Sequence, residues 1–269
     1  MTNRFDVAGC VVIITGGAGL LGREYGRALS EAGARVVLAD LDPSVVADVA
    51  ADVATAGPVL GLSADVTSEA SVGALVARTL TEFGQIDGLV NNAAINPQFG
   101  ADRTAHTTRF EDFPMDPWNQ ALAVNLTGMF LCARAVVPYM RARQHGSIVN
   151  ISSTYGLVGP DQRLYETVDG TPQEFKPVTY SVTKSGVLGL TRYLATYLAG
   201  TGIRVNTLTP GGVFTSQSPE FVRRYSERTT LNRMARPHEY SGALQFLLSD
   251  ASSYMTGSNL IVDGGWTAW

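Results

Sequence analysis

A tyrosine and a lysine lie four residues apart near the middle of the chain, in the stretch VTYSVTKSGVLGLTRYLA (178–195). In a helix, positions i and i+4 project from the same face, so Tyr180 and Lys184 can meet. A free tyrosine has a pKa of roughly 10, too high for a base at neutral pH. A neighbouring ammonium favours the phenolate and lowers that pKa. The two residues are therefore either a proton-transfer pair or ordinary residues on a solvated helix face.

A second candidate site lies in the segment VVIITGGAGLLGREYG (11–26), which predicts a strand, a glycine-rich turn and the start of a helix. Gly16, Gly19 and Gly22 recur at every third position. Glycine lets the backbone turn tightly and approach a pyrophosphate, and the amides at the helix N-terminus then face the phosphates. The motif predicts a dinucleotide-binding turn, and the alternative is a tight strand–helix turn without a ligand.

Asp40 ends the next predicted strand, in VVLADLD (36–42). A carboxylate at this position can accept hydrogen bonds from the ribose hydroxyls of adenosine, and it repels a 2′-phosphate. Leu41 and Asp42 follow, so no basic residue comes directly after it. The segment predicts NAD rather than NADP as the cofactor, and the alternative is that Asp40 only caps a turn.

Short apolar runs that alternate with longer helical patterns predict the framework that must position these residues. Seven runs are nearly continuously apolar, as expected for parallel strands covered on both faces: 10–16, 34–40, 59–66, 87–93, 146–153, 203–210 and 259–265. Helical patterns include 22–33, 68–84 and 118–144, the last interrupted by Pro138. The alternation predicts one α/β domain over residues 1–269, a doubly wound Rossmann-type fold with a seven-stranded parallel sheet flanked by helices.

Two long polar segments, at about 95–117 and 154–177, do not fit the alternation. Both follow strands at their carboxyl ends, where open α/β sheets bind ligands, so we expect them to form a substrate rim. Asn96, Tyr155 and Arg163 are the candidates for substrate contacts, and Arg163 is a candidate anchor for a carboxylate or phosphate. The many donors and acceptors suit a hydroxyl-rich or charged molecule, and the alternative is that both segments are only solvated loops.

The overall composition argues against several classes of protein. With 45% apolar residues, 16% charged residues and a net charge of −4 over 269 residues, we expect a packed globular protein that binds neither nucleic acid nor an anionic membrane. No apolar run approaches the roughly 20 residues of a membrane span, and the N-terminus lacks a signal-peptide layout, so a cytoplasmic location is expected. Cys10 and Cys132 lie in apolar stretches as expected for buried thiols, and no Cys/His spacing predicts a metal site.

The chain carries eight short motifs in order: TGGAGLLG (15–22), ADV (64–66), NNAA (91–94), VNLTG (124–128), NISS (150–153), YSVTK (180–184), PGGVFT (210–215) and VDGGW (262–266). Together they resemble the short-chain dehydrogenase/reductase family, in its compact single-domain branch, over essentially the whole length. Each motif alone is loose, whereas eight in the right order are specific. The resemblance implies an oxidoreductase that interconverts a secondary alcohol and a ketone with a nicotinamide cofactor.

The resemblance also implies the roles of individual residues. Tyr180 would be the general acid/base for the substrate oxygen, Ser153 would hydrogen-bond that oxygen, and Lys184 together with the positive nicotinamide would lower the pKa of Tyr180. Ser153 is preferred to Ser152 because the family's serine precedes x-x-Gly. Asn125 would hold the helix geometry and a water that passes protons on from Lys184. Cofactor contacts are assigned to Thr15, Gly16, Gly19, Leu20, Leu21, Gly22, Asp40, Leu41, Asp65, Val66, Asn92, Ala93, Ala94, Tyr180, Lys184, Pro210, Gly211, Val213 and Thr215.

Three features depart from the family's pattern. Leu20 stands where this branch has its middle glycine, and Gly19 comes one residue earlier, a spacing more typical of the larger epimerase/dehydratase branch. Ala94 replaces the usual glycine of N-N-A-G. The gap between Ser153 and Tyr180 is well above the family's common spacing, so the extra residues must loop out and return for both side chains to meet one substrate oxygen.

The long insertion and the ending VDGGWTAW (262–269) look similar to family members of sugar metabolism, including nonulosonic-acid surface-sugar pathways. We therefore expect a hydroxyl-rich substrate such as a sugar, sugar acid, polyol or activated sugar. The alternative is a 3-oxoacyl-(carrier protein) reductase, which would normally prefer NADP. A remote alternative is a non-catalytic NAD-sensing protein. Family members are mostly homotetramers or dimers, so we expect a homotetramer, and Trp266 and Trp269, poorly buried in a monomer, would serve that interface.

Overall fold

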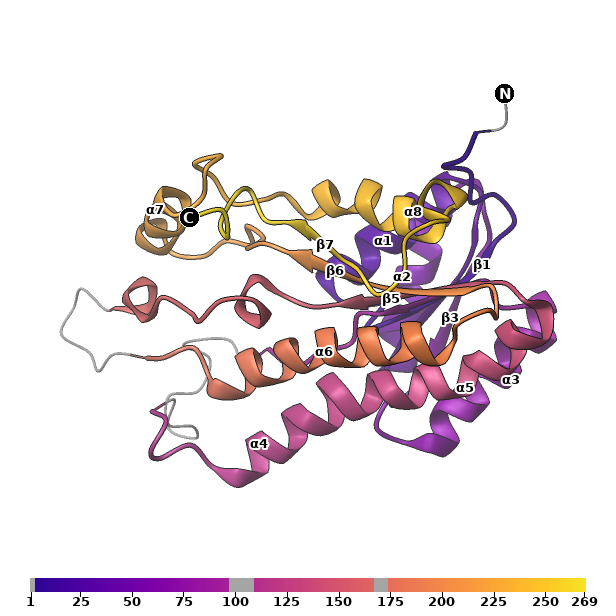
Figure 1. Ribbon diagram of the computed structural model, residues 1–269, viewed down its shortest axis with the longest axis horizontal. Coiled ribbons are helices and arrows are strands. Elements are labelled where there is room, and N and C mark those ends of the chain that lie inside the picture. Colours follow the sequence, from indigo (N-terminus) through magenta and orange to yellow (C-terminus); the bar gives the residue numbers. More distant parts are fainter. Residues whose placement is uncertain (1–2, 97–108, 167–173) are drawn as a thin grey trace.

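Seven parallel strands form the central layer of the fold within residues 3–96, 109–166 and 174–269, which the computed structural model describes (Figure 1). They are β1 (Val11–Thr15), β2 (Arg35–Asp40), β3 (Val59–Ser63), β4 (Gly88–Asn91), β5 (Gly146–Ile151), β6 (Ile203–Pro210) and β7 (Asn259–Val262). Each strand lies inside one of the seven predicted ranges, so the predicted Rossmann-type parallel sheet is confirmed.

The strand order β3-β2-β1-β4-β5-β6-β7 creates a switch point beside β1. On one side β1 pairs with β2, with Val11 opposite Arg35, and on the other side it pairs with β4, with Val12 opposite Gly88. The segments that leave β1 and β4 therefore run to opposite faces of the sheet. Open α/β sheets bind ligands in the crevice that this reversal leaves at the carboxyl edge.

Helices cover both faces of the sheet (Figure 1). One face carries α1 (Leu20–Glu31), α2 (Pro43–Val53) and α8 (Ser241–Leu248), and the other carries α3 (Glu69–Phe83), α4 (Met115–Leu122), α5 (Gly128–Arg143) and α6 (Val178–Tyr197). Side chains alternate accordingly along β1: Val12 and Ile14 pack with α1 and α8, whereas Ile13 packs with α3 and α5. The short α7 (Pro219–Glu227) lies beyond the carboxyl edge of the sheet (Figure 1).

The helical run from Met115 to Arg143 differs from its prediction. The break expected at Pro138 is wrong, because α5 continues through this residue. The interruption lies instead at Ala123–Thr127, a π-helical turn that contains Asn125. A π-helical turn has wider hydrogen-bond spacing than an α-helical turn and is frequent at functional sites. The apolar periodicity of this run does not distinguish the two kinds of turn.

The same run is the one helix in the described part of the chain that is long and apolar enough to cross a membrane. This differs from the expectation that no apolar run approaches that length. Leu131, Val136 and Met140 are buried against α3 and the sheet, whereas Phe130 and Tyr139 are each 44% exposed. Packing within the fold therefore accounts for part of the hydropathy of this helix.

Asp87 joins three elements at the amino end of β4. Its side chain is 6% exposed; Oδ2 accepts a hydrogen bond from the Val11 N–H (2.8 Å) and Oδ1 accepts one from Arg143 (2.7 Å). Asp87→Ala leaves a buried N–H without its acceptor, so we expect urea denaturation to show a loss of about 2–3 kcal/mol in the free energy of unfolding. The control Asp52→Ala removes only an exposed ion pair with Arg27 and should cost less than about 0.5 kcal/mol. Equal losses in the two variants would contradict this role of Asp87.

Candidate active site

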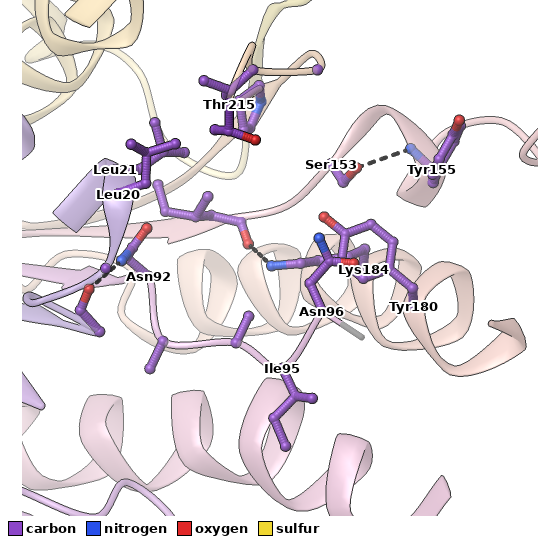
Figure 2. Close-up of a pocket in the computed structure, with 18 of the residues that line it drawn as sticks. Leu20, Leu21, Asn92, Ile95, Asn96, Ser153, Tyr155, Tyr180, Lys184 and Thr215 are labelled. Atoms are coloured by element: carbon purple, nitrogen blue, oxygen red, sulfur yellow. Dashed lines mark hydrogen bonds between the residues drawn. The ribbon is translucent and has the colours of Figure 1, made fainter. Parts of the chain in front are cut away.

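A cavity of about 1510 Å³ lies at the carboxyl edge of the sheet and is lined by most of the predicted site residues (Figure 2). It extends from the glycine turn and the end of β2, past the ends of β4 and β5, to the start of α6 and the segment after β6. The predicted residues that line it are Gly16, Gly19, Leu20, Leu21, Asp40, Leu41, Asp65, Val66, Asn92, Ala93, Ala94, Asn96, Ser153, Tyr155, Tyr180, Lys184, Pro210, Gly211, Val213 and Thr215.

The glycine turn between β1 and α1 is packed so closely at Gly16 and Gly22 that neither position has room for a side chain. Gly16 has a φ of 64°, and a Cβ there would lie 2.8 Å from the Cα of Ala93. A Cβ on Gly22 would lie 2.2 Å from the carbonyl oxygen of Gly16. The side-chain amide of Asn92 donates hydrogen bonds to the carbonyl oxygens of Thr15 and Gly16, each at 3.0 Å. Thr15 and Gly22 thus shape the turn from behind and do not line the cavity.

The open end of α1 fits a negatively charged group. Gly19 is the N-cap residue, and no side chain caps the first amides of the helix. Those N–H groups have no partners within the helix, and the dipole of the helix favours an anion beside them. A glycine-rich turn that opens onto the uncapped N-terminus of a helix suits a pyrophosphate, so the residues present fit a dinucleotide cofactor.

Asp40 borders the cavity at the end of β2, next to the glycine turn. Its Oδ2 accepts a hydrogen bond from the Ala18 N–H (2.9 Å), and its Oδ1 accepts one from the Leu41 N–H (2.8 Å). The carboxylate therefore does cap a turn, as the alternative interpretation stated. A carboxylate has about four lone-pair sites, so two remain to accept hydrogen bonds from ribose hydroxyls. The two roles of Asp40 are compatible.

Ser153, Tyr180 and Lys184 lie together on one side of the cavity (Figure 2). Tyr180 and Lys184 come from α6, and Ser153 follows the end of β5, where its Oγ accepts a hydrogen bond from the Tyr155 N–H (3.2 Å). Ser152 instead donates to the carbonyl oxygen of Lys184 (2.8 Å). Although the inserted segment separates Ser153 from Tyr180 in sequence, it returns to bring both side chains to the same cavity.

Burial shifts the pKa values of Tyr180 and Lys184 in opposite directions. The Nζ of Lys184 donates to the carbonyl oxygen of Ile151 (2.8 Å), and burial lowers the pKa of Lys184 to about 8. Burial raises the pKa of Tyr180, and the nearby Ser153 hydroxyl offsets this only in part. The expected lowering of the Tyr180 pKa is therefore not produced by the protein alone, because desolvation of the phenol dominates.

Asn125 lies behind the cavity and links two of its walls. Its Oδ1 accepts a hydrogen bond from the Ile95 N–H (2.7 Å), and its Nδ2 donates to the Ile95 carbonyl (3.1 Å) and to the Thr183 hydroxyl (3.1 Å). The π-helical turn thus holds the segment after β4 against α6. This geometry agrees with the expected positioning role, whereas the expected water relay stays a prediction.

Arg163 is the predicted substrate-contact residue that the structure does not bring to the cavity. Its side chain is 74% exposed, and its guanidinium is bound to Asp161 at 2.7 Å. The cation that does line this end of the cavity is Lys176, which the sequence reasoning placed in the polar rim without a role. The sequence contained a signal that could have identified Lys176: Lys176 and Lys184 are the only lysines of the chain, and they lie eight positions apart around Tyr180. Other parts of the expected rim, 97–108 and 167–173, lie outside the described residues.

Aromatic side chains form part of the cavity wall; the sequence analysis predicted Tyr155 and Tyr180 there but not Tyr225. Tyr155 lies edge-on to Tyr180, with ring centroids 6.5 Å apart, and Tyr225 also lines the cavity. Trp266 stacks on Tyr225 at 4.3 Å and is 3% exposed, so the expectation that it is poorly buried in a monomer is wrong. Trp269, in contrast, is 74% exposed. The rim is therefore apolar on one side as well as polar on the other.

Comparison with known proteins adds a family and several relatives. The chain matches the family model described as enoyl-(acyl carrier protein) reductase over residues 17–267. It is 37% identical to the cis-4-hydroxycyclohexanecarboxylate dehydrogenase of Sinomonas cyclohexanicum, and the match covers 96% of each chain. It is 38% identical to a 3-alpha-(or 20-beta)-hydroxysteroid dehydrogenase of Mycobacterium bovis, over 97% of this chain and 90% of the relative.

Solved structures show the same fold in similar proteins. A gluconate 5-dehydrogenase of Burkholderia cenocepacia, solved in complex with NADP and tartrate, superposes with a TM-score of 0.85 at 31% identity. The superposition covers 99% of this chain and 98% of the other. All three named relatives are dehydrogenases of hydroxyl-bearing compounds, although their substrates differ widely in polarity.

Proposed function

This chain belongs to the short-chain dehydrogenase/reductase family and is an oxidoreductase that acts on CH–OH groups, and we propose that it interconverts a secondary alcohol and a ketone with NAD as its cofactor. One observation carries the proposal: Ser153, Tyr180 and Lys184 line the same cavity as the glycine turn and Asp40. A single continuous space can therefore hold a dinucleotide and a substrate oxygen together.

The proton chemistry of this reaction is assigned to the residues around Tyr180. The Ser153 hydroxyl can donate a hydrogen bond to the substrate oxygen, while the Tyr180 hydroxyl takes up or releases the proton of that oxygen. The lowered pKa of Lys184, about 8, lets its ammonium exchange protons near neutral pH. A nicotinamide, when bound, would supply the hydride acceptor or donor. Because Lys184 is buried, the charges that develop here are poorly screened by water.

The preference for NAD is supported by the place of Asp40 beside the glycine turn. A solved relative contains NADP, so the two cofactors must be compared directly. We expect kcat/KM with NAD to exceed that with NADP by about 100-fold, since like charges placed together cost several kcal/mol. Asp40→Ser removes the charge but keeps an acceptor for the Ala18 N–H, so the ratio should fall by about tenfold or more. The control Asp42→Ser changes a carboxylate that only caps α2. A ratio that is unchanged in Asp40→Ser, or lowered equally in Asp42→Ser, would contradict the proposal.

The proposed substrate is a polar, hydroxyl-bearing molecule such as a sugar acid or polyol. Asn96, Glu166, Glu174, Lys176 and Gln217 line the substrate end of the cavity and supply hydrogen-bonding groups. The aromatic wall also favours a second candidate, a cyclic alcohol whose ring packs on Tyr155 and Tyr225, which is the kind of compound named for two of the relatives.

The proposed assembly is a homotetramer. Exposed apolar and aromatic side chains gather on α5, α6 and β7: Phe130, Tyr139, Val182, Tyr193, Tyr197 and Ile261. Such patches on a globular protein commonly form interfaces. Size-exclusion chromatography with light scattering would test it, since a mass of one chain, 28.6 kDa, across micromolar concentrations would rule out a stable assembly.

The experiment that tests the function follows nicotinamide absorbance with the purified protein. NAD and NADP are each compared with sugars, sugar acids, polyols, nucleotide-linked sugars, cyclic alcohols and acyl thioesters. Turnover of an alcohol with NAD supports the proposal and identifies the substrate class. NADP-dependent reduction of an acyl thioester would instead support the carrier-protein reductase alternative, and NAD binding without turnover would support a sensing protein.

A further inference from the structure

Lys176 places a second ammonium group beside the candidate catalytic tyrosine. It lies two residues before α6, is 8% exposed and lines the cavity. Its Nζ lies 4.2 Å from the ring centroid of Tyr180, closer than the Nζ of Lys184 at 5.9 Å. Both lysines of the chain therefore flank one tyrosine. All the other residues that carry a permanent positive charge are arginines.

Three contacts hold the Lys176 side chain in place. Its Nζ donates a hydrogen bond to Oδ1 of Asn96, in the segment after β4. Its backbone N–H donates to Oε1 of Gln162 across the inserted segment at 2.8 Å. The face of the Tyr180 ring provides a cation–π contact. The ammonium is thus fixed at the substrate end of the cavity, near the hydroxyl that is proposed to act on the substrate.

Two of the carboxylates at this end of the cavity are already bound to arginine. Oε1 of Glu220 accepts a hydrogen bond from Arg224 at 2.7 Å, and Glu166 lies 3.8 Å from the same guanidinium. Both glutamates line the cavity. Arg223 also pairs with Glu220 at 2.8 Å, so the charge of Glu220 is compensated from outside the cavity, whereas Glu166 shares Arg224 with it. Glu220 therefore adds little repulsion against an anion that enters the cavity.

Among the described residues, the other charged side chains that line this end of the cavity are Lys176, Lys184 and Glu174, one carboxylate against two ammonium groups. Burial, with a contribution from the nearby Lys184, lowers the pKa of Lys176 to about 8. Two buried ammonium groups repel each other, and an anion placed beside Lys176 would relieve that repulsion and restore the charged form. The site has the charge and the burial that suit recognition of a negatively charged group.

We propose that Lys176 binds a carboxylate group of the substrate, so that the alcohol this enzyme acts on is a hydroxy acid. This inference rests on the proposed function and names its substrate class. The ammonium lies 4.2 Å from the centroid of the Tyr180 ring, so a carboxylate bound to it would lie on the same side of the cavity as the reacting carbon. Tyr155 provides an apolar surface for the carbon skeleton beside Tyr180.

The kinetic test compares hydroxy acids with their primary amides, which differ mainly in charge. The pairs are 3-hydroxybutyrate, cis-4-hydroxycyclohexanecarboxylate and gluconate, each with its amide. For at least one pair, we expect kcat/KM of the acid to exceed that of the amide by about 10- to 100-fold at pH 7, the usual strength of a charge-assisted hydrogen bond. In Lys176→Met this ratio should fall toward one, and Lys176→Arg should retain part of it.

Arg163→Met is the matched control, since it removes an exposed cation of the same inserted segment. It should leave the acid-to-amide ratio as it is in the wild type. A ratio near one in the wild type for every pair that is turned over, or a ratio kept in Lys176→Met, would overturn the proposal. A loss of the ratio in Arg163→Met but not in Lys176→Met would move the carboxylate site to Arg163.

A binding measurement separates this inference from the proposed reaction. Because the chain has two lysines, protein labelled with ¹³C at lysine Cε gives two side-chain signals, and Lys176→Arg assigns them. We expect at least one of the three hydroxy acids to shift the Lys176 signal and to raise the pKa of Lys176, whereas its amide does neither. If no acid acts differently from its amide, the proposal is wrong even if alcohols are oxidised. If an acid binds but no alcohol is turned over, the proposed function fails instead.

Discussion

Tyr180→Phe is expected to lower kcat/KM by about 10³-fold, the typical contribution of a positioned acid/base group. The phenol hydroxyl is the group placed to exchange a proton with a substrate oxygen, because Tyr180 lines the cavity together with Ser153 and Lys184. Phenylalanine keeps the ring that packs against Tyr155 and beneath Lys176. Initial rates with the preferred substrate of the wild type would measure the loss.

Two controls show whether the loss of kcat/KM reflects lost proton transfer rather than lost cofactor binding or stability. NADH fluorescence should report nearly the same cofactor affinity in Tyr180→Phe as in the wild type, and thermal unfolding should shift little because the ring remains. Ser152→Ala removes a neighbouring hydroxyl that bonds the backbone of Lys184 and not Tyr180, so its effect on the rate should be far smaller. A Tyr180→Phe variant with more than about a tenth of the wild-type activity would rule out the proposed proton transfer.

Gly22→Ala is expected to destabilise the protein and to abolish dinucleotide binding. A Cβ on Gly22 would lie 2.2 Å from the carbonyl oxygen of Gly16 and 2.8 Å from the Cα of Gly17, and both are backbone atoms that cannot move aside alone. The turn must therefore open, which we expect to lower the free energy of unfolding by about 3 kcal/mol or more. Urea denaturation and NADH titration would measure the two losses.

Gly19→Ala provides the matched comparison within the same turn. A Cβ on Gly19 would lie 3.3 Å from the Gly16 carbonyl oxygen, and the φ of Gly19 is −71°, which alanine adopts readily. We expect its stability to change by less than about 1 kcal/mol. Because Gly19 lines the cavity, the methyl group that this substitution adds should still weaken NADH binding. Equal stability of the Gly19→Ala and Gly22→Ala variants would contradict the close packing described for this turn.

Much of the fold follows from local patterns that the sequence displays directly. All seven strands were predicted because parallel strands covered on both faces are apolar throughout. The ends of α3 were predicted for a similar reason, since Ser68 caps its first turn and Gly84 takes the left-handed conformation that ends it. These features depend on neighbours in sequence or on burial alone.

The features that were missed depend on contacts between distant segments. The π-helical turn at Asn125 is stabilised by Ile95 and Thr183, neither of which is close to it in the chain. Arg163 seemed a better anchor than Lys176 because arginine suits carboxylates in general, yet Asp161 two residues earlier binds its guanidinium. Trp266 is buried because Tyr225 lies beneath it. No periodicity or motif reports such pairings.

The two-lysine composition also determines how this protein meets amine-directed chemistry. Lys176 and Lys184 are 8% and 3% exposed, so neither lysine offers acylating reagents much accessible surface. Cross-linkers, fluorescent esters and a lysine-specific protease should therefore leave the folded protein nearly untouched. Any acylation of a lysine side chain would take place in the cavity itself. The rate of that acylation would measure how often reagents enter the cavity, and a bound ligand should lower it.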